Sequence, residues 1–170
     1  EMDQTVLLID SDLAKPGLSR LLDIESEKGL TDYLSGDVKN IGDVIKRTDI
    51  PKLSIVGAGS VHSKATELLA SRAMAHLLDE LAKRYPDRII IFDSPPLLAT
   101  TESVVLSSQM GQVCLVVESS STPQFMVKQA IDHLHSTDNV SLILNKVKPD
   151  LLSTGYGYGY GYGYGYGEKS

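Results

Sequence analysis

The feature that most constrains the fold is a series of short, continuously apolar runs. Four of them are TVLLID (5–10), KLSIV (52–56), RIIIFD (88–93) and QVCLVV (112–117), and VSLILN (140–145) is similar. They are rich in Val, Ile and Leu and do not alternate apolar with polar residues. Such runs are typical of strands covered on both faces, as in parallel sheets. We therefore expect five buried strands at these positions.

Segments with helical spacing lie between the apolar runs. Residues 66–84 predict one amphipathic helix, with Leu69, Ala73, Leu77 and Leu81 on a single stripe. Further helices are expected at 18–23, 29–34, 99–108 and 123–135, the last capped by Thr122 with Pro123 in its first turn. Alternating strands and helices imply right-handed crossovers. The expected fold is α/β, a mostly parallel sheet with helices on both faces.

Composition narrows the class of protein. A chain of 170 residues suffices for one domain, and a net charge of −6 argues against a nucleic-acid-binding surface. The single cysteine, Cys114, lies in an apolar run and is expected to be a buried, inert thiol of a cytoplasmic protein. The sequence has no apolar stretch long enough to span a bilayer and no signal peptide. We expect any link to a membrane to come through a partner or through further sequence.

Acidic residues close two of the expected strands, at the edge where open α/β sheets bind ligands. The first run ends in Asp10, with Asp12 two residues later, and the third ends in Asp93. Neighbouring carboxylates repel one another, and Mg²⁺ with a bound phosphate would offset that cost. An Asp after four apolar residues also has the general form of a Walker B strand. Each Asp can equally well cap a turn or helix.

Three other features have less specific interpretations. Asn145 ends the fifth run and can either contact a purine edge or cap a turn. The segment GAGSVHSKAT (57–66) resembles a phosphate-binding loop but lacks Gly before and Ser or Thr after Lys64, so we interpret it as an ordinary strand-to-helix loop. The four histidines share no ligand spacing, which argues against a zinc site.

Together these segments resemble the bacterial tyrosine kinases, which belong with the MinD/ParA-type deviant Walker ATPases. VLLIDSDLAKPGLSRLL is similar to the family's Walker A′ segment and IIIFDSPP to its Walker B. GLTDYLSG and ATELLAS match segments between the two, and the tail GYGYGYGYGYGYG (155–167) is most similar to autokinases of exosortase-linked exopolysaccharide clusters. The resemblance runs from about residue 5 to the C-terminus.

The resemblance implies roles for individual residues. Asp10 and Asp12 would lie near Mg²⁺ and the ATP phosphates, one of them assisting deprotonation of a tyrosine hydroxyl, while Asp93 would hold Mg²⁺ through water. Lys15 and Asn145 would contact the nucleotide, Asn145 at the adenine. The implied phosphate acceptors are Tyr156, Tyr158, Tyr160, Tyr162, Tyr164 and Tyr166.

The resemblance also implies partners and a setting. These are a homo-oligomeric ring that phosphorylates itself in trans, a membrane-embedded activator of polysaccharide export, and a tyrosine phosphatase. The expected localisation is cytoplasmic, at the inner membrane through that partner. The expected activity is ATP-dependent tyrosine phosphorylation that regulates exopolysaccharide biosynthesis or export.

Two departures from the family pattern stand out. Ala14 occupies a position where the family usually has Arg, and the 170 residues contain no G-x-x-x-x-G-K-[ST] loop. The opening EMDQ is similar to the end of the helix that follows this loop in the family. We therefore expect 1–150 to be a partial P-loop kinase domain that binds ATP weakly and is inactive alone, with an exposed sheet edge. The alternatives are a non-catalytic interaction module and a MinD/ParA-type ATPase.

The Gly-Tyr tail allows three interpretations. Alternation would put every tyrosine on one face of a strand, but glycine is unfavourable in strands. A low-complexity, adhesive segment is a second possibility, and a flexible acceptor tail over 151–170 is a third. Six phosphates would add strong negative charge and repel a chain already at −6. With the resemblance, the acceptor tail is favoured, and its phosphorylation is expected to drive disassembly of the ring.

Overall fold

A computed structural model of the chain describes residues 4–24, 27–134 and 136–148. The strands are β1 (Thr5–Asp10), β2 (Ile45–Arg47), β3 (Leu53–Val56), β4 (Arg88–Asp93), β5 (Val113–Glu118) and β6 (Val140–Asn145). The helices are α1 (Leu18–Leu21), α2 (Leu30–Ser35), α3 (Ala65–Leu69), α4 (Arg72–Arg84), α5 (Thr101–Ser107) and α6 (Gln124–Asp132), with a 3-10 turn, η1, at Ile41–Asp43. All five expected strands are confirmed to within about a residue. The Gly-Tyr tail lies outside the described residues.

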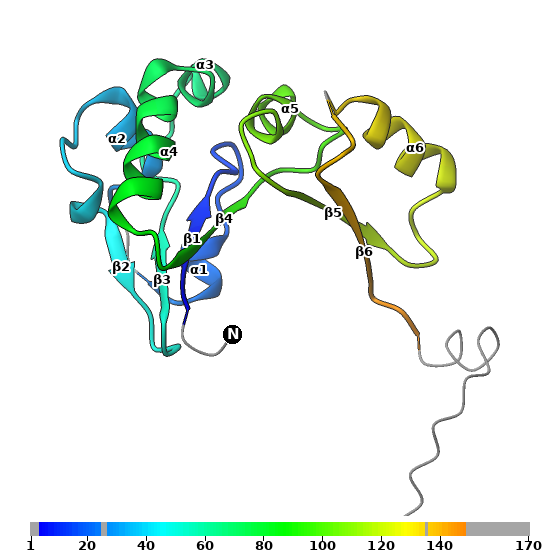
Figure 1. The fold of residues 1–170 in the computed structure, drawn as a ribbon, viewed down its shortest axis with the longest axis horizontal. Helices are drawn as coiled ribbons and strands as arrows, with labels where there is room; N and C mark the ends of the chain where they lie inside the picture. The colour runs from blue at the N-terminus through cyan, green and yellow to red at the C-terminus, as the bar shows by residue number, and fades with distance from the viewer. Residues whose placement is uncertain (1–3, 25–26, 135, 149–170) are drawn as a thin grey trace, which may run out of the picture.

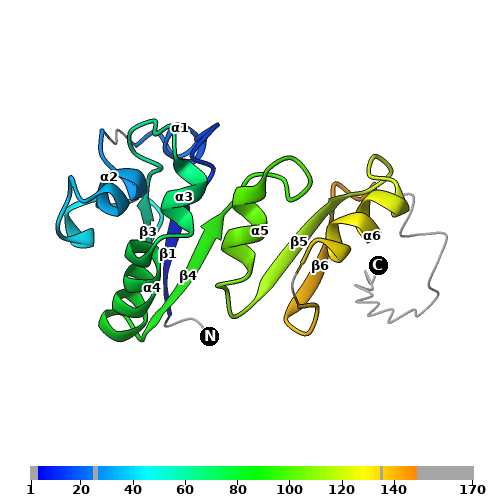
Figure 2. The same ribbon diagram turned by 90° about the horizontal axis from the view of Figure 1, so that it is seen from above.

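The described strands form two sheets. One has the order β2-β3-β1-β4, in which β3 and β4 both run parallel to β1 and β2 runs antiparallel to β3. The other is the parallel pair β5-β6. Figure 1 shows the two sheets on opposite sides of the molecule, with α5 between them, and Figure 2 shows the same arrangement from above. The α/β class and the mostly parallel pairing are confirmed.

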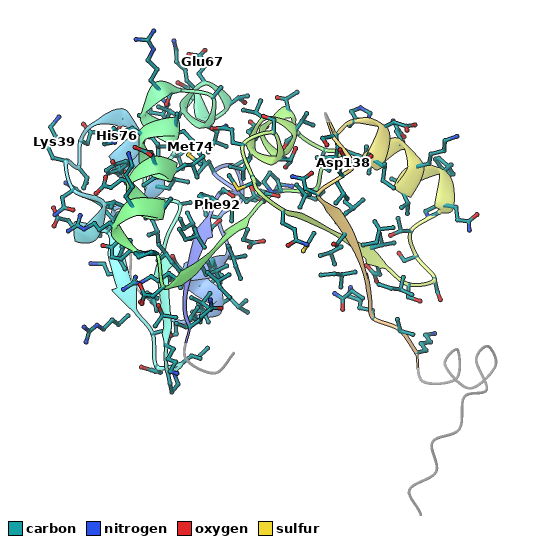
Figure 3. All side chains as sticks on the ribbon, viewed as in Figure 1. Lys39, Glu67, Met74, His76, Phe92 and Asp138 are labelled. Atoms are coloured by element: carbon teal, nitrogen blue, oxygen red, sulfur yellow. The ribbon has the colours of Figure 1, made fainter. Side chains whose placement is uncertain are left out.

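The core lies between the four-stranded sheet and its helices. Leu7 and Ile9 of β1 are fully buried, as are Leu77 and Leu81 of α4. Met74 of α4 is buried too and lies on the side of that helix toward the sheet, whereas charged side chains such as Lys39 extend outward (Figure 3). Burying a side chain of this size contributes about 1.5–3 kcal/mol. The carboxyl ends of β1 and β4 are therefore fixed on a well-packed base.

The helix predicted over 66–84 is two helices. The apolar stripe is present, but α3 ends at Leu69 and α4 begins at Arg72. The Ser71 hydroxyl accepts a hydrogen bond from the Met74 amide at 3.3 Å and caps the second helix. A serine cap competes with helix continuation because its side chain satisfies an amide that would otherwise bond within the helix. The prediction of one continuous helix was wrong for this reason.

Burial on both faces holds for some strands only. Ile55 and Val56 of β3 are fully buried, whereas Ile89 and Ile91 of β4 are 46% and 45% exposed. Val116 of β5 is exposed as well. Cys114, which is two residues from Val116 and therefore on the same face of β5, is exposed, so the expectation of a buried thiol was wrong.

Several local expectations need smaller corrections. Pro123 is the N-cap residue of α6, with ψ of 146°, and is not inside its first turn. The short antiparallel strand β2 was not predicted, because its sequence IKR is mostly charged. No helix among the described residues is long and apolar enough to cross a membrane.

Candidate functional site

Two of the predicted acidic residues end neighbouring strands. Asp10 of β1 and Asp93 of β4 are register partners. Ser11 strengthens this junction, because its backbone N–H and its hydroxyl both donate to the carbonyl oxygen of Asp93, at 2.8 and 2.5 Å. Ser11 is fully buried, and sequence reasoning missed it. The carboxyl ends of β1 and β4 are thus held side by side.

The carboxylate of Asp10 organises the loop that follows β1. One oxygen accepts from the Asp12 amide at 3.2 Å, and the other accepts from the amides of Gly17 and Leu18 at 3.1 and 3.0 Å. The residue is 1% exposed. A carboxylate has about four acceptor positions, so three accepted bonds leave room for about one more contact. Much of the capacity of Asp10 is used to fold the loop back to the start of α1.

The carboxylate of Asp12 is more available to a ligand than that of Asp10. It is partly exposed, and one of its oxygens accepts from the amide of Lys15 at 2.9 Å, closing a turn. Lys15 and Ala14 are both exposed in this turn. Ala14 leaves no basic side chain at that position. The loop therefore presents one carboxylate and one lysine ammonium group at the sheet edge.

Negative charge accumulates around Asp93. Partial burial raises the pKa of Asp93, and the nearby charges of Asp10 and Asp12 raise it further. No basic side chain contributes to this shift. Asp10 and Asp12 are therefore both close enough to Asp93 to repel its negative charge, and a cation at this edge would relieve that repulsion.

The three carboxylates do not form a closed metal cage. Among residues 4–24, 27–134 and 136–148, no group of three or more His, Cys, Asp or Glu side chains is arranged to hold a metal ion directly. Mg²⁺ keeps several of its waters in proteins and takes one or two carboxylates together with phosphate oxygens. An open, repulsive carboxylate edge fits that mode of binding and does not fit an all-protein Ca²⁺ or Zn²⁺ site.

Asn145 lies apart from the acidic residues. It ends β6 as the register partner of Glu118 on β5, in the separate two-stranded sheet. Its side-chain oxygen accepts from the amide of Lys146 at 2.8 Å, and the residue is exposed. No described contact joins Asn145 to Asp10, Asp12 or Asp93, so the predicted nucleotide residues are divided between two sheets. The six predicted acceptor tyrosines of the tail lie outside the described residues.

The loop after β3 is also held in place, through a residue that sequence reasoning did not single out. The buried carboxylate of Asp32 accepts hydrogen bonds from Gly29 and Ser60. A signal was present in the sequence, since an Asp three residues after Gly29 sits where a helix N-terminus favours an acid. Its partner is 28 residues away, which no local pattern indicates.

Solved structures resemble this fold closely. The kinase domain of the Escherichia coli tyrosine kinase ETK superposes with a TM-score of 0.79 at 30% identity, covering 95% of this chain and 62% of that one. The VpsO kinase domain superposes with a TM-score of 0.78 at 32% identity, covering 86% of this chain and 72% of that one. The chain belongs to the bacterial tyrosine kinases. The resemblance of the sequence to this family is thereby confirmed.

The sequence is also similar to those of curated bacterial tyrosine kinases. The putative tyrosine-protein kinase EpsB of Ralstonia nicotianae is 30% identical over 153 residues, which are 89% of this chain and 20% of EpsB. CpsD of Streptococcus agalactiae is 31% identical over 152 residues, 88% of this chain and 65% of CpsD. The chain thus spans about a fifth of the length of EpsB and about two thirds of that of CpsD.

More distant structures share the fold alone. The MinD protein of Pyrococcus horikoshii superposes with a TM-score of 0.56 at 18% identity. No protein-family model matches the sequence.

Proposed function

We propose that this chain forms the Walker A′ and Walker B part of a protein-tyrosine kinase that uses Mg²⁺–ATP. The observation that carries the proposal is the register pairing of Asp10 with Asp93, with Asp12 two residues away, at one edge of a parallel sheet. Family membership supplies the reaction type. The three acids are proposed to have different roles because they differ in burial and in the hydrogen bonds that they accept.

Asp10 serves mainly to shape the loop, because three backbone amides occupy its carboxylate. Asp12 has an oxygen with no hydrogen bond described and is partly exposed, so it is the better group to accept the proton of a tyrosine hydroxyl. A tyrosine hydroxyl ordinarily has a pKa near 10, so a positioned base helps it attack at neutral pH.

In the proposed transfer, the tyrosine oxygen forms a bond to the γ-phosphorus of ATP while the bond from that phosphorus to the β,γ-bridging oxygen breaks. ADP leaves, and the hydroxyl proton passes to the Asp12 carboxylate. Asp93 would hold Mg²⁺ through water, and Asp10, its register partner on the neighbouring strand, would add negative charge at the same edge. A bound Mg²⁺ would neutralise charge on the phosphates and on these carboxylates. Lys15, whose amide donates to Asp12 and whose side chain is exposed, would contact a phosphate.

We further propose that a P-loop strand completes the sheet between β4 and β5. Both strands lie at the edge of their sheets, so each has an unpaired side among the described residues. Ile89, Ile91 and Val116 are exposed on these two strands. A parallel strand there would join the two sheets, supply the phosphate-binding loop that the 170 residues lack, and bring Asn145 to the same edge as Asp93. Residues 1–150 would then be part of a larger kinase domain.

From the resemblance we propose the remaining roles. Tyr156, Tyr158, Tyr160, Tyr162, Tyr164 and Tyr166 are the acceptors, phosphorylated in trans within a homo-oligomeric ring and cleared by a tyrosine phosphatase. Repulsion between the added phosphates loosens the ring. The protein is cytoplasmic, is attached to the inner membrane through a polysaccharide-export activator, and regulates exopolysaccharide biosynthesis or export.

The test is transfer of the γ-phosphate of labelled ATP by the full-length protein in the presence of Mg²⁺. The expected result is phosphotyrosine within residues 156–166, lost in Asp93→Asn and strongly reduced in Asp12→Asn. Absence of phosphotyrosine from a folded full-length protein would refute the kinase proposal. It would support the alternative of a non-catalytic interaction module, which the missing P-loop motif favours.

A further inference from the structure

The loop that follows β3 is bonded to the start of α2. The amides of Leu30 and Thr31 donate to the carbonyl oxygens of Gly57 and Ala58 at 2.8 and 2.9 Å, and the Thr31 hydroxyl donates to Ala58 at 2.8 Å. These bonds satisfy amide groups that an isolated helix would leave unpaired at its N-terminus. We call residues 29–32 and 57–60 together the Asp32 clamp.

The carboxylate of Asp32 joins the two halves of the clamp. It accepts from the Gly29 amide at 2.8 Å, from the Ser60 amide at 3.1 Å and from the Ser60 hydroxyl at 2.6 Å, and it is 4% exposed. Burial acts to raise the pKa of Asp32, but hydrogen bonds from Ser60 and Gly29 outweigh it and lower the pKa. The side chain is therefore ionised at neutral pH and makes charge-assisted bonds to the loop.

Two glycines allow the halves to approach this closely. A Cβ on Gly29 would overlap the carbonyl oxygen of Gly57. Gly59 has a φ of +84°, and a Cβ there would overlap the Asp32 carboxylate. A side chain at either position would push the loop away, so the sequence is adapted to fix this backbone path.

The clamped loop begins beside the acidic site. Val56, the last residue of β3, pairs with Ile9 of β1, so Gly57 leaves its strand next to Asp10. Directly after the clamp, Val61 is 88% exposed, followed by His62 and Lys64. The loop turns back on itself here, since the Lys64 amide donates to Nδ1 of His62 at 3.1 Å, and the exposed Lys64 side chain pairs with Glu67 at 3.4 Å.

We propose that loop 57–64 holds the tyrosine-bearing segment at the acidic site, and that Asp32 is a positioning residue acting through this loop. The occupant is the Gly-Tyr segment 155–167. Its chemistry matches: Val61 offers an apolar contact to a tyrosine ring, and the exposed ammonium group of Lys64 offers positive charge to phosphates already added to neighbouring tyrosines. The inference rests on the proposed kinase function and adds how the acceptor is recognised.

The experiment measures phosphorylation, by the full-length protein at saturating ATP, of a synthetic peptide with the sequence of residues 155–161. Asp32→Ala is expected to raise the KM for the peptide about tenfold with the KM for ATP unchanged. Asp32→Asn keeps the shape but has one acceptor oxygen in place of two, so its peptide KM should fall between those of Asp32→Ala and wild type. Val61→Ser should raise the peptide KM without changing stability. Asp79→Ala, at an exposed acid of α4 paired with Lys83, is the matched control and should behave as wild type.

The inference would be overturned if folded Val61→Ser had an unchanged KM for the peptide. It would also be overturned if Asp32→Ala raised the KM for ATP as much as the KM for the peptide. If Asp32→Ala does not fold, the peptide KM of Val61→Ser alone tests the inference. If the wild-type protein phosphorylates no tyrosine, the kinase proposal fails, and a fluorescent form of the same peptide decides the inference separately. It must bind more weakly to Val61→Ser than to wild type, and equal binding contradicts the role of the loop.

Discussion

Asp10 and Asp93 end two neighbouring parallel strands as register partners, and the hydroxyl and amide of Ser11 tie them together through the carbonyl oxygen of Asp93. Two acids side by side at the end of a sheet oppose folding electrostatically. Partial burial raises the pKa of Asp93, and the negative charges of Asp10 and Asp12 raise it further. The pair is therefore kept at a cost in stability, which is typical of groups retained for function.

The two acids of the first loop should separate into a structural and a chemical role. Asp10→Ala removes the acceptor of three backbone amides, one of them the buried amide of Leu18, and should lower the free energy of unfolding by about 2–4 kcal/mol. Asp12→Ala loses one exposed bond to Lys15 and should cost under about 1 kcal/mol. Urea unfolding measures both. Equal losses would contradict the assignment of Asp10 to loop architecture.

The strand ends were predictable from sequence because each strand is a continuous apolar run closed by a polar residue. That pattern places Asp10 and Asp93 at one edge before any contact is known. Cys114 was mispredicted for a related reason. A run such as VCLVV indicates a strand, but whether its second face is covered depends on neighbours that the run does not contain.

The break between α3 and α4 and the Asp32 clamp were not predictable. The apolar stripe continues from Leu69 to Ala73 across the break, so periodicity gives no sign of it, and the break is marked by the Ser71 cap that begins α4. The bond from Ser60 to Asp32 spans 28 residues and depends on how α2 packs against the loop after β3. The break thus comes from a local cap that apolar periodicity does not report, whereas the clamp comes from a tertiary contact that no local pattern contains.

Asp32 should make the stability of the fold sensitive to acid. Its folded-state pKa lies below the ordinary value near 3.9, so its contribution is present above that value and is lost as the pH falls through the folded-state pKa. Urea unfolding between pH 7 and pH 3 should show a smaller acid-induced loss for Asp32→Asn than for wild type. Asp79→Asn, which changes an exposed acid, should follow the wild-type curve. Identical curves for all three proteins would contradict an ionised Asp32 in the clamp.

Gly29 should tolerate no side chain. Gly29→Ala forces the Gly57 carbonyl and the start of α2 apart and should cost more than about 2 kcal/mol in urea unfolding. Gly111→Ala is the matched control, because a Cβ there meets no atom within 4 Å, and its effect should stay within about 0.5 kcal/mol. Similar costs at the two sites would mean that the loss comes from general backbone effects and not from the clamp.

The open side of β4 should make the 170-residue chain associate with itself. β4 has a strand partner, β1, on one side only among the described residues, and Ile89 and Ile91 are about half exposed. Unpaired, apolar strand edges pair with other chains, and a charged side chain there opposes it. Ile91→Lys should therefore shift sedimentation-velocity profiles toward monomer at concentrations where the unaltered chain forms dimers or larger species.

Ile50→Lys is the control for this last prediction, because Ile50 is 51% exposed but lies in the turn between β2 and β3, away from the open edge. It adds the same charge and should leave association unchanged. If both lysines reduce association equally, net charge is the cause and the edge is not the interface. If a P-loop strand covers β4 in the full-length protein, Ile91→Lys should destabilise that protein by burying a charge, while its cost in the 170-residue chain stays small. The same substitution thus tests both the exposed edge and the proposed completion of the sheet.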